Sequence, residues 1–392
     1  MSKLKELIDR LCPDGVEYTT LGKVAEIKRG VRVVKNELEN DGDIPVFQNS
    51  LTPLGYYTKS NFLADTTFVI GAGAAGEIGY SSVAYWGADD CYSIICTPKV
   101  ISKYIYYQLA NNQIFLKSRV RTASIPRLAR TAIEQFPISV PPIEVQEEIV
   151  KILDRFSDYA AELQAELQAR KEQYEYYRNL LLTFNPSAYG CGTDGEQEIK
   201  DVTTWGGHSY KIAWKSMGEI CQNMDRFRKP ITSSKRISGE YPYYGASGIV
   251  DYVDNYIFDG DYLLISEDGA NLLARSTPIA FPISGKNWVN NHAHVLKFDN
   301  AYTQRYVQYY VNMIDISKYV SGGAQPKLNQ ENLNSICIPI PPLEIQEKIV
   351  AILDRFETLV NDLTKGLPAE IAAVKEQYEY YRNKLLTFKQ RA

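Results

Sequence analysis

Histidine, paired cysteines and long apolar runs are all scarce in this sequence of 392 residues. Only three histidines are present, and His292 and His294 alternate as on a strand, so packing is expected of them rather than metal ligation. The six cysteines form no CxxC pair, and with no signal peptide they indicate reduced thiols in a cytoplasmic protein. No apolar run approaches the roughly 18–20 residues of a membrane span. We therefore expect a cytoplasmic globular protein without a metal site.

Complete catalytic motifs are missing as well. Gly71 to Gly76 fits GxGxxG, but a strand-like run follows it and Asp89 comes too early for a dinucleotide site, so we interpret it as a β-turn loop. Asp14, Glu26 and Lys28 fit a loose metal-dependent nuclease pattern, although Asp14-Gly15 is better explained as a turn. Neither a GxxxxGK[ST] phosphate loop nor an adenine-methyltransferase motif is present. The sequence therefore predicts no catalytic residue and no cofactor in this chain.

Two segments of the chain occur twice. PPIEVQEEIVKILDRF (141–156) returns as PPLEIQEKIVAILDRF (341–356), with 12 of 16 residues identical. KEQYEYYRNLLLTF (171–184) returns as KEQYEYYRNKLLTF (375–388), with 13 of 14 identical. Weaker similarity upstream aligns 120–128 with 320–328. The chain is therefore an internal duplication.

The duplication divides the chain into globular, helical, globular and helical parts. The globular parts are rich in β-branched and aromatic residues in short runs that alternate with Gly, Asn and Asp turns, which indicates mixed α+β domains with a twisted sheet. The predicted boundaries are 1–140 for the first domain, 141–184 for the central helix, 185–207 for a connector, 208–340 for the second domain and 341–392 for the distal helix.

Charge is distributed unevenly between these parts. The net charge is −4, but the segments 141–184 and 341–388 together carry −6, which leaves the other 300 residues at +2. Acidic helices are typical of protein docking surfaces, and basic clusters elsewhere are typical of phosphate contact. Scattered surface charge is the simpler alternative for these clusters.

Each helical segment has an apolar seam with heptad spacing. About 40 helical residues would extend about 60 Å, and two helices with the same seam most simply pair antiparallel; folding of each helix back onto its own domain is the alternative. The second copy contains a four-residue insertion at Leu367, flanked by Gly366 and Pro368. We therefore expect a kink or break in the second helix there.

A Tyr-Glu-Tyr-Tyr-Arg cluster ends each helix, and at 100° per residue its tyrosines cannot all face one seam. Exposed Tyr and Arg are enriched at protein contacts, so we expect this cluster to bind a partner, twice. The predicted partner-binding residues are Tyr174, Tyr176, Tyr177, Arg178, Tyr378, Tyr380, Tyr381 and Arg382.

The two repeated motifs resemble the central and distal conserved regions of the specificity subunits of Type I restriction-modification systems. The order of parts is also similar, and the resemblance covers essentially the whole chain. It implies two target-recognition domains, held apart by antiparallel coiled-coil helices, that read the 5′ and 3′ parts of a split double-stranded DNA target. It also implies two methyltransferase (modification) subunits bound to the helices, with restriction subunits joining them. S-adenosylmethionine, ATP and Mg are then expected on those partners.

Basic and amide side chains on loops are the candidates for DNA contact. In the first domain the predicted residues are Lys28, Arg29, Arg32, Gln48, Asn49, Arg119, Arg121 and Arg127. In the second domain they are Arg226, Arg228, Lys229, Asn271, Arg275, Gln325 and Lys327. Arg127 and Lys327 occupy equivalent positions of the repeat, which favours phosphate contact over base reading.

Two other functions stay open at this point: a structural coiled-coil scaffold without DNA binding, and a self-contained DNA-modifying enzyme. The first predicts no sequence preference in gel shifts, and the second would need a complete catalytic motif. Residues 161–168 are themselves a four-residue duplication (AELQAELQ), and each unit adds about 6 Å of helix. Helix length is therefore expected to set the spacer between the two parts of the DNA target.

Overall fold

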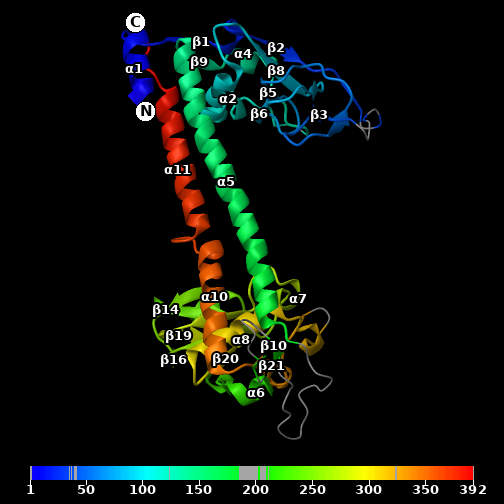
Figure 1. Cartoon of the computed structure of the whole chain (residues 1–392), viewed down its shortest axis with the longest axis vertical. Helices are drawn as coiled ribbons and strands as arrows, with labels where there is room; N and C mark the ends of the chain where they lie inside the picture. Colours follow the sequence, from blue (N-terminus) through cyan, green and yellow to red (C-terminus); the bar gives the residue numbers. More distant parts are fainter. Residues whose placement is uncertain are drawn as a thin grey trace. The chain divides into compact units, whose positions relative to one another are not determined.

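The computed structural model describes residues 2–34, 36, 38, 42–122, 124–184, 202–203, 209–210, 212–322 and 325–391 (Figure 1). The chain forms two compact units: residues 1–165 with 369–392 make unit 1, and residues 166–368 make unit 2. The predicted connector at 185–207 lies outside the described residues except for β10 (Val202–Thr203), which pairs with β11 (Ser209–Tyr210).

Unit 1 begins with a helix and continues as a mixed α+β domain. Its strands are β1 (Glu17–Thr20), β2 (Ala25–Arg29), β3 (Ile44–Phe47), β4 (Gly55–Tyr57), β5 (Thr66–Ile70), β6 (Ile78–Ser81), β7 (Trp86–Gly87), β8 (Cys91–Cys96) and β9 (Pro137–Val140). Its helices are α1 (Ser2–Leu11), α2 (Ser102–Asn111), α3 (Gln113–Lys117), α4 (Arg130–Glu134) and the first part of α5 (Ile143–Leu182).

Three sheets build this domain. An antiparallel sheet has the strand order β2-β8-β5-β6, a second has the order β4-β3-β7 with β3 and β7 parallel, and β1 pairs with β9. All of β5 is buried: Val69 packs with the α2 residues Tyr104 and Ile105, while Phe68 and Ile70 pack in a separate aromatic cluster. Burial on both faces explains why β5 shows no alternation of exposed polar and buried apolar residues: its two threonines are buried as well, and the Thr67 hydroxyl donates to Ser102 O (2.6 Å).

Unit 2 has the same topology. Its strands are β12 (Ala213–Ser216), β13 (Gln222–Asn223), β14 (Ser238–Gly245), β15 (Gly248–Val253), β16 (Phe258–Asp259), β17 (Tyr262–Ser266), β18 (Ala280–Ile283), β19 (Lys286–Val289), β20 (Ala293–Lys297) and β21 (Cys337–Ile340). Its helices are α6 (Met217–Ile220), α7 (Asn271–Ala274), α8 (Ala301–Met313), α9 (Gln330–Asn334), the end of α5, and α10 (Leu343–Asn361).

The sheets of unit 2 repeat those of unit 1, except that the second sheet has a fourth strand, β16. The order β13-β20-β17-β18 matches β2-β8-β5-β6, and β12 pairs with β21 as β1 pairs with β9. In the remaining sheet, β15-β14-β19-β16, the strands β14 and β19 are parallel, as β3 and β7 are. The duplication found in the sequence is therefore a duplication of the whole fold.

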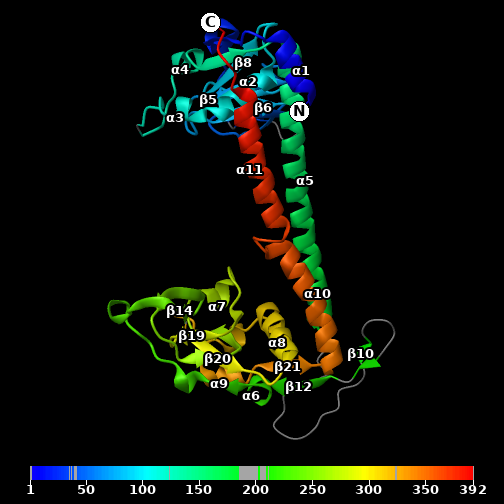
Figure 2. The same ribbon diagram turned by 90° about the vertical axis from the view of Figure 1, so that its left-hand side faces the viewer.

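Antiparallel helix pairs complete both units. In unit 1, Phe156 of α5 stacks on Tyr381 of α11 (Leu367–Leu386) at a 5.5 Å centroid distance, and the Tyr159 hydroxyl donates to Glu370 (2.7 Å). From Phe156 to Tyr159 the chain moves forward along α5, while the contacted residue on α11 moves back from Tyr381 to Glu370. The two helices therefore run antiparallel (Figure 2). In unit 2, Tyr177 of α5 stacks on Phe356 of α10 at 5.6 Å. The expected α+β fold with paired antiparallel helices is confirmed.

The distal helix breaks where the sequence predicts. Helix α10 ends at Asn361 and α11 begins at Leu367, with Pro368 in its first turn, where a missing N–H does no harm. The Asp362 carboxylate accepts from the backbone N–H of Thr364 (2.7 Å). A Cβ on Gly366 would lie only 2.4 Å from the Thr358 carbonyl oxygen, so glycine permits this tight turn.

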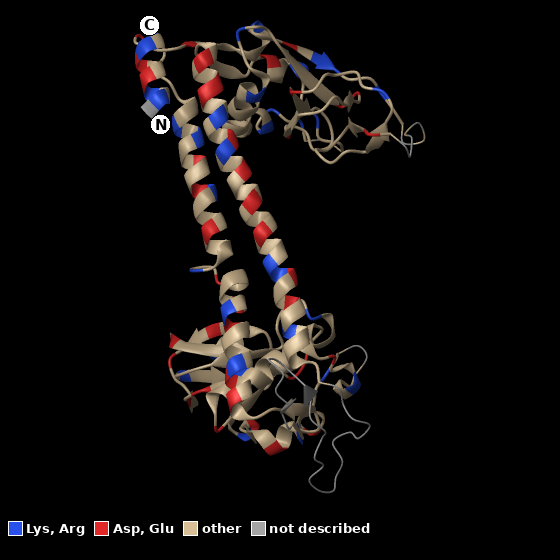
Figure 3. Ribbon diagram, viewed as in Figure 1, with Lys and Arg blue, Asp and Glu red and all other residues tan. Residues whose placement is uncertain are grey.

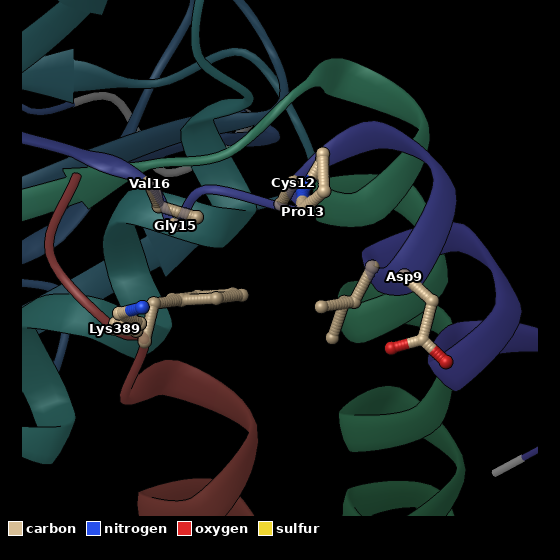
Figure 4. A pocket seen from close by; sticks show the side chains of 8 residues that line it. Asp9, Cys12, Pro13, Gly15, Val16 and Lys389 are labelled. Carbon is tan, nitrogen blue, oxygen red and sulfur yellow. The ribbon is translucent and has the colours of Figure 1, made fainter.

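The end of the chain closes unit 1 against its beginning. The Val16 N–H donates to Lys389 O (2.9 Å), and the Arg391 N–H donates to Val16 O (3.0 Å). The Tyr18 hydroxyl donates to Phe388 O (2.9 Å). Beside these bonds lies a cavity of about 440 Å³ between α1 and the residues after α11 (Figure 4). The last residues of the chain thus act as an additional strand-like segment of the first domain.

The state of the cysteines differs in part from expectation. Cys12, Cys91, Cys96 and Cys221 are free thiols, but Cys337 is disulfide-bonded. The prediction of six reduced thiols was wrong for Cys337 because sequence spacing excludes only local pairs. Cys191 lies outside the described residues. None of the helices in the described part of the chain is long and apolar enough to cross a membrane.

Candidate nucleic-acid interface

A basic loop follows the first strand of the large sheet in unit 1. Lys28 and Arg29 end β2 and Arg32 follows, all three exposed. The Arg29 Nε donates to Asp89 O (2.6 Å), and Lys28 lies 3.4 Å from Glu26. The indole N–H of Trp86 donates to the Val31 carbonyl (2.9 Å), which fixes the path of the loop. Its basic side chains are therefore presented to solvent from a fixed backbone.

A second loop in unit 1 is closed by a pair of backbone hydrogen bonds. The Arg121 N–H donates to Arg127 O (2.8 Å), and the Arg127 N–H donates to Arg121 O (3.1 Å). This loop rests on the Gly71–Gly76 segment, because the Gly73 N–H donates to Pro126 O (3.1 Å). The Ala74 N–H donates in turn to Asn49 O (2.9 Å). The structure therefore brings Asn49, Arg121 and Arg127 together.

The glycines of the GxGxxG-like segment serve this arrangement. Gly73 has φ +81°, and a Cβ there would lie 2.8 Å from Asn49. Residues 71–77 form bends and turns, not the start of a helix. The prediction of a turn loop rather than a dinucleotide site is confirmed.

Arg119 and Gln48 are placed differently from the residues of that loop. The Arg119 guanidinium lies over the Phe115 ring at 3.5 Å and donates to Phe115 O (2.8 Å), although the residue stays exposed. Gln48 is half-buried. Both lie beside the loops, but part of the Arg119 side chain is already engaged within the domain.

Unit 2 repeats the two loops. The Ser321 N–H donates to Lys327 O (2.8 Å) and the Lys327 N–H to Ser321 O (2.7 Å), as between Arg121 and Arg127. The Gly269 N–H donates to Pro326 O (3.1 Å), at the same distance as the bond from Gly73 to Pro126. The Trp288 indole N–H donates to Lys229 O (2.5 Å). Both domains thus hold a tryptophan-anchored basic loop and a bridge-closed loop.

The two loops of unit 2 meet at a buried carboxylate. Glu267 accepts from Arg228 Nη1 (2.6 Å) and lies 3.0 Å from Lys327 Nζ. Burial raises the pKa of the Glu267 carboxyl, but the bonds from Arg228 and Lys327 outweigh it and hold the pKa below its ordinary value. In unit 1 the position equivalent to Glu267 is Gly71, which has no carboxylate. Lys327 is therefore partly neutralised within its domain, whereas no acid of this kind faces Arg127 among the described residues.

His294 and Asp225 extend this cluster inward. The His294 Nε2 lies 2.8 Å from Leu328 O, which can only accept, and Nδ1 lies 2.6 Å from the Asp225 carboxylate. Asp225 also accepts from the Val295 N–H (2.8 Å). Burial raises the pKa of Asp225, but the His294 bond and charge, the Val295 N–H and Arg228 together lower it below its ordinary value. His294 is buried and packed within the domain, as the sequence predicted.

Asp225, Glu267 and His294 offer ligand atoms within 4.8 Å of one another, the geometry of a possible metal site. Each is already engaged, however, and the Arg228 guanidinium contacts both carboxylates. A cation could enter only by displacing Arg228. The cluster is best described as a buried ion network that ties the two loops of the second domain together.

Three predicted DNA contacts have internal roles instead. The Arg228 side chain is only 13% exposed and also donates to Ala293 O (2.7 Å). The Asn271 side chain accepts from Ser276 Oγ (2.9 Å) and donates to Thr277 O (3.0 Å), which closes the loop after α7. Arg275, at φ 51°, donates to Val311 O and Ile314 O at the end of α8, and burial lowers its pKa. We therefore leave these three out of the contact set.

The remaining candidates of unit 2 are exposed. Arg226 lies over the Phe227 ring at 4.6 Å, and Lys229 and Gln325 are exposed on their loops. With Lys327 they form the part of the predicted set that solvent can reach.

The tyrosine clusters divide into packed and exposed members. Tyr174 and Tyr177 pack on Phe356 in unit 2, and Tyr378 and Tyr381 pack on Phe156 in unit 1. The middle tyrosine of each cluster faces outward: Tyr176 is 64% and Tyr380 is 60% exposed. Arg178 lies over Tyr174 and Arg382 over Tyr378. Four of the six tyrosines therefore stabilise the helix pairs.

Sequence reasoning missed the anchoring tryptophans. Trp86 and Trp288 each occupy a strand that pairs in parallel with the second sheet's long strand, and each bonds the basic loop of its own domain. The signal was present, because two of only four tryptophans recur about 200 residues apart. The low similarity around them hid this equivalence.

The architecture of the chain is similar to that of a solved structure. A crystal structure of a type I restriction-modification system S subunit from M. genitalium superposes with a TM-score of 0.64, covers 95% of this chain and 96% of its own, and is 16% identical. At this identity the likeness concerns the fold: tandem α+β domains joined by paired helices.

The chain belongs to the type I restriction modification DNA specificity family. The family model matches residues 13–173 and 211–373, one copy in each half. The specificity subunit of the type I restriction enzymes EcoR124I and EcoR124II of Escherichia coli is 30% identical over 319 residues, which are 74% of this chain and 72% of that protein.

A Haemophilus influenzae protein assigned to the same subunit class is 38% identical over 180 residues, which span 45% of this chain and 46% of that protein. Family membership confirms the prediction of a non-catalytic specificity subunit over the scaffold and the self-contained enzyme. Figure 3 shows acidic residues interspersed with basic ones along α5, α10 and α11.

Proposed function

We propose that this subunit reads a split DNA target, the first domain reading the 5′ part and the second the 3′ part. The observation that carries the proposal is the repetition of one loop arrangement in two domains of similar topology. Each domain presents a tryptophan-anchored basic loop beside a loop closed by backbone bonds. Fixed backbones with exposed cations and amides suit phosphate positioning and base reading.

The proposed contacts are the exposed members of the predicted set, together with the half-buried Gln48. Arg127, Lys327 and the loop cations contact phosphates, and amide side chains beside them read base edges. In the first domain the set comprises Lys28, Arg29, Arg32, Gln48, Asn49, Arg119, Arg121 and Arg127. In the second domain it comprises Arg226, Lys229, Gln325 and Lys327.

Arg127→Ala tests the contact set, with Arg130→Ala as its matched control. Both arginines are exposed, but Arg130 pairs with Glu134 (2.7 Å). Loss of one phosphate contact should make the slope of log K against log salt shallower by about 1. The measurement is a salt titration of DNA binding by the full subunit with its modification partners. Equal slopes for wild type and Arg127→Ala would remove Arg127 from the interface.

The partners are proposed from the exposed tyrosines. Tyr176 with Arg178, and Tyr380 with Arg382, each dock one modification subunit, and restriction subunits join that assembly. S-adenosylmethionine, ATP and Mg would act on those partners. Tyr176→Ala should release one modification subunit of two, measured by native mass spectrometry. Tyr302→Ala, which removes a similarly exposed tyrosine on α8, should release none; release by both variants alike would refute the assignment.

A further inference from the structure

The residue before the proline of each bridge-closed loop differs in chemistry between the two domains. Ile125 precedes Pro126 in the first domain, and it is 52% exposed. Gln325 precedes Pro326 in the second domain and is exposed as well. The two positions are equivalent, because each proline carbonyl accepts from a glycine N–H of the segment beneath it and the next residue closes the bridge. One position of the repeat therefore presents an apolar side chain in one domain and an amide in the other.

The backbone that follows Ile125 is fixed to its own domain. The Pro126 carbonyl accepts from the Gly73 N–H (3.1 Å), and Arg127 exchanges two backbone hydrogen bonds with Arg121 (2.8 and 3.1 Å). Proline also restricts the residue before it to extended conformations. A fixed backbone lowers the conformational entropy that Ile125 would lose on binding, so its side chain is preorganised for a contact.

Gln325 is held in a similar way. The Pro326 carbonyl accepts from the Gly269 N–H (3.1 Å). Gly322, at φ +84°, turns the chain so tightly that a Cβ there would lie 2.5 Å from the Gln325 carbonyl oxygen. Both loops therefore hold the residue before the proline in a defined place, and the domains differ in the side chain that they hold there.

Exposed cations flank Ile125 on its own loop. A single exposed apolar residue is common on protein surfaces and by itself indicates no site. Ile125 differs because it lies between Arg121 and Arg127, which are both exposed and belong to the proposed phosphate contacts. Phosphate contacts set the position of a loop on the duplex, and side chains beside them reach the base edges in the groove.

The two side chains suit different bases. Isoleucine forms no hydrogen bond, and the group on a base edge that it contacts favourably is the methyl group of thymine in the major groove. A polar group of another base, placed against Ile125, would lose a hydrogen bond to water without a replacement. Glutamine can donate to N7 of adenine and accept from its N6 amino group.

We propose that Ile125 is a specificity-determining residue that contacts the methyl group of a thymine in the 5′ part of the target. Gln325 binds an adenine in the 3′ part from the equivalent position. The proposal rests on the proposed reading of a split target, and it names the residue with which each domain reads one base. The flanking cations hold each loop on the phosphates, and the residue before the proline selects the base.

Exchange of the two side chains tests the assignment. Ile125→Gln and Gln325→Ile are made separately in the full subunit, and each variant is expressed with its modification subunits. A plasmid library varies each base pair of the two half-sites in turn, and sequencing of methylated bases gives the relative methylation of every target. Ile114→Gln is the matched control, because it makes the same substitution at an 80% exposed isoleucine of α3.

Ile125→Gln should change the preference at one position of the 5′ half-site from thymine to adenine by about ten-fold and leave the 3′ half-site unchanged. Gln325→Ile should make the opposite change at one position of the 3′ half-site alone. Ile114→Gln should change neither half-site. An unchanged base preference in either exchange variant, or the same change in Ile114→Gln, would overturn the proposal.

Loss of all methylation in an exchange variant is resolved with alanine at the same position, which removes the contact and adds no new group. A weaker preference for the native base in the alanine variant supports the proposal. An unchanged preference, or loss of all methylation in the alanine variant too, overturns it. A wild-type subunit that methylates no split target would instead refute the proposed function.

Discussion

Replacing Asp225 with alanine should loosen one sheet of the second domain and leave the first domain unchanged. Asp225 joins β20 to the buried ion network: it contacts His294 at 2.6 Å and accepts from the Val295 N–H at 2.8 Å. The His294 side chain is only 1% and that of Asp225 only 7% exposed, so alanine leaves both partners unpaired in the core. Breaking a buried charge pair in this way costs about 3–5 kcal/mol.

Asparagine at the same position is the matched comparison. Its side-chain oxygen still accepts from the Val295 N–H, and its amide can donate to a neutral His294 whose Nε2–H bonds Leu328 O. The bonds to His294 and Val295 survive, while Arg228 and Asn223 lose the oxygen that accepts from them, so the cost should be about 1–2 kcal/mol. The specific prediction is that the stability of this sheet rises in the order alanine variant, asparagine variant, wild type.

Hydrogen–deuterium exchange mass spectrometry measures these changes locally. A loss of about 3 kcal/mol raises the exchange rate of affected amides by about two orders of magnitude. The rise should be confined to β13, β20 and β17, with β2, β8 and β5 as the reference within the same molecule. Unchanged exchange in β20, or equal exchange in the two variants, would refute the role of the network.

The pH dependence of this network has a definite sign. Asp225 and Glu267 both have a pKa below their ordinary values of 3.8 and 4.5. Their stabilisation is therefore fully present above about pH 4.5 and is lost as the pH falls through the lowered values. The Asp225→Ala variant should accordingly lose less stability than wild type over that acid range.

Three further perturbations test other parts of the fold. Gly366→Ala should destabilise unit 2 by about 1–3 kcal/mol, because the new Cβ meets a carbonyl oxygen at 2.4 Å. Gly218→Ala, whose Cβ has its nearest contact at 3.4 Å, should be near neutral. Urea unfolding measures the stability of both variants. Deleting residues 387–392 should expose the Val16 N–H to rapid exchange, and continued protection there would contradict the closure of unit 1. Deleting residues 161–164 should shorten the spacer of the target by about one or two base pairs, since it removes about 6 Å of helix. Methylome sequencing measures the spacer length, and an unchanged spacer would contradict the prediction.

The sequence predicted what repetition and periodicity can encode. Duplicated motifs placed both conserved helices, and the insertion at Leu367 with its flanking Gly366 and Pro368 located the break that separates α10 from α11. These features depend on local backbone preference and on heptad spacing, both of which are readable along the chain.

Partners that are distant in sequence limited the prediction of the site. Arg228 looks like any exposed cation of a basic cluster, and only the fold brings Glu267 to within 2.6 Å of it. Arg275 likewise binds carbonyl groups about 36 residues away at the end of α8. Backbone acceptors leave no mark on the sequence, so such side chains cannot be distinguished from DNA contacts without the structure.

The tyrosine clusters show the same limit in another form. Periodicity requires that some tyrosines leave the seam, but the phase of the helix decides which ones. Packing on Phe156 and Phe356 selects the first and third tyrosine of each cluster and leaves Tyr176 and Tyr380 outside.

Mapping of methylated bases across the genome of a cell that carries this subunit with its modification partners tests the central claim most directly. The account predicts methylation at a target of two short sequences separated by a non-specific spacer of fixed length. Exchange of residues 208–340 for the corresponding domain of another specificity subunit should change the 3′ sequence alone. Methylation at one continuous sequence, or a change in both half-sites after the exchange, would contradict the account.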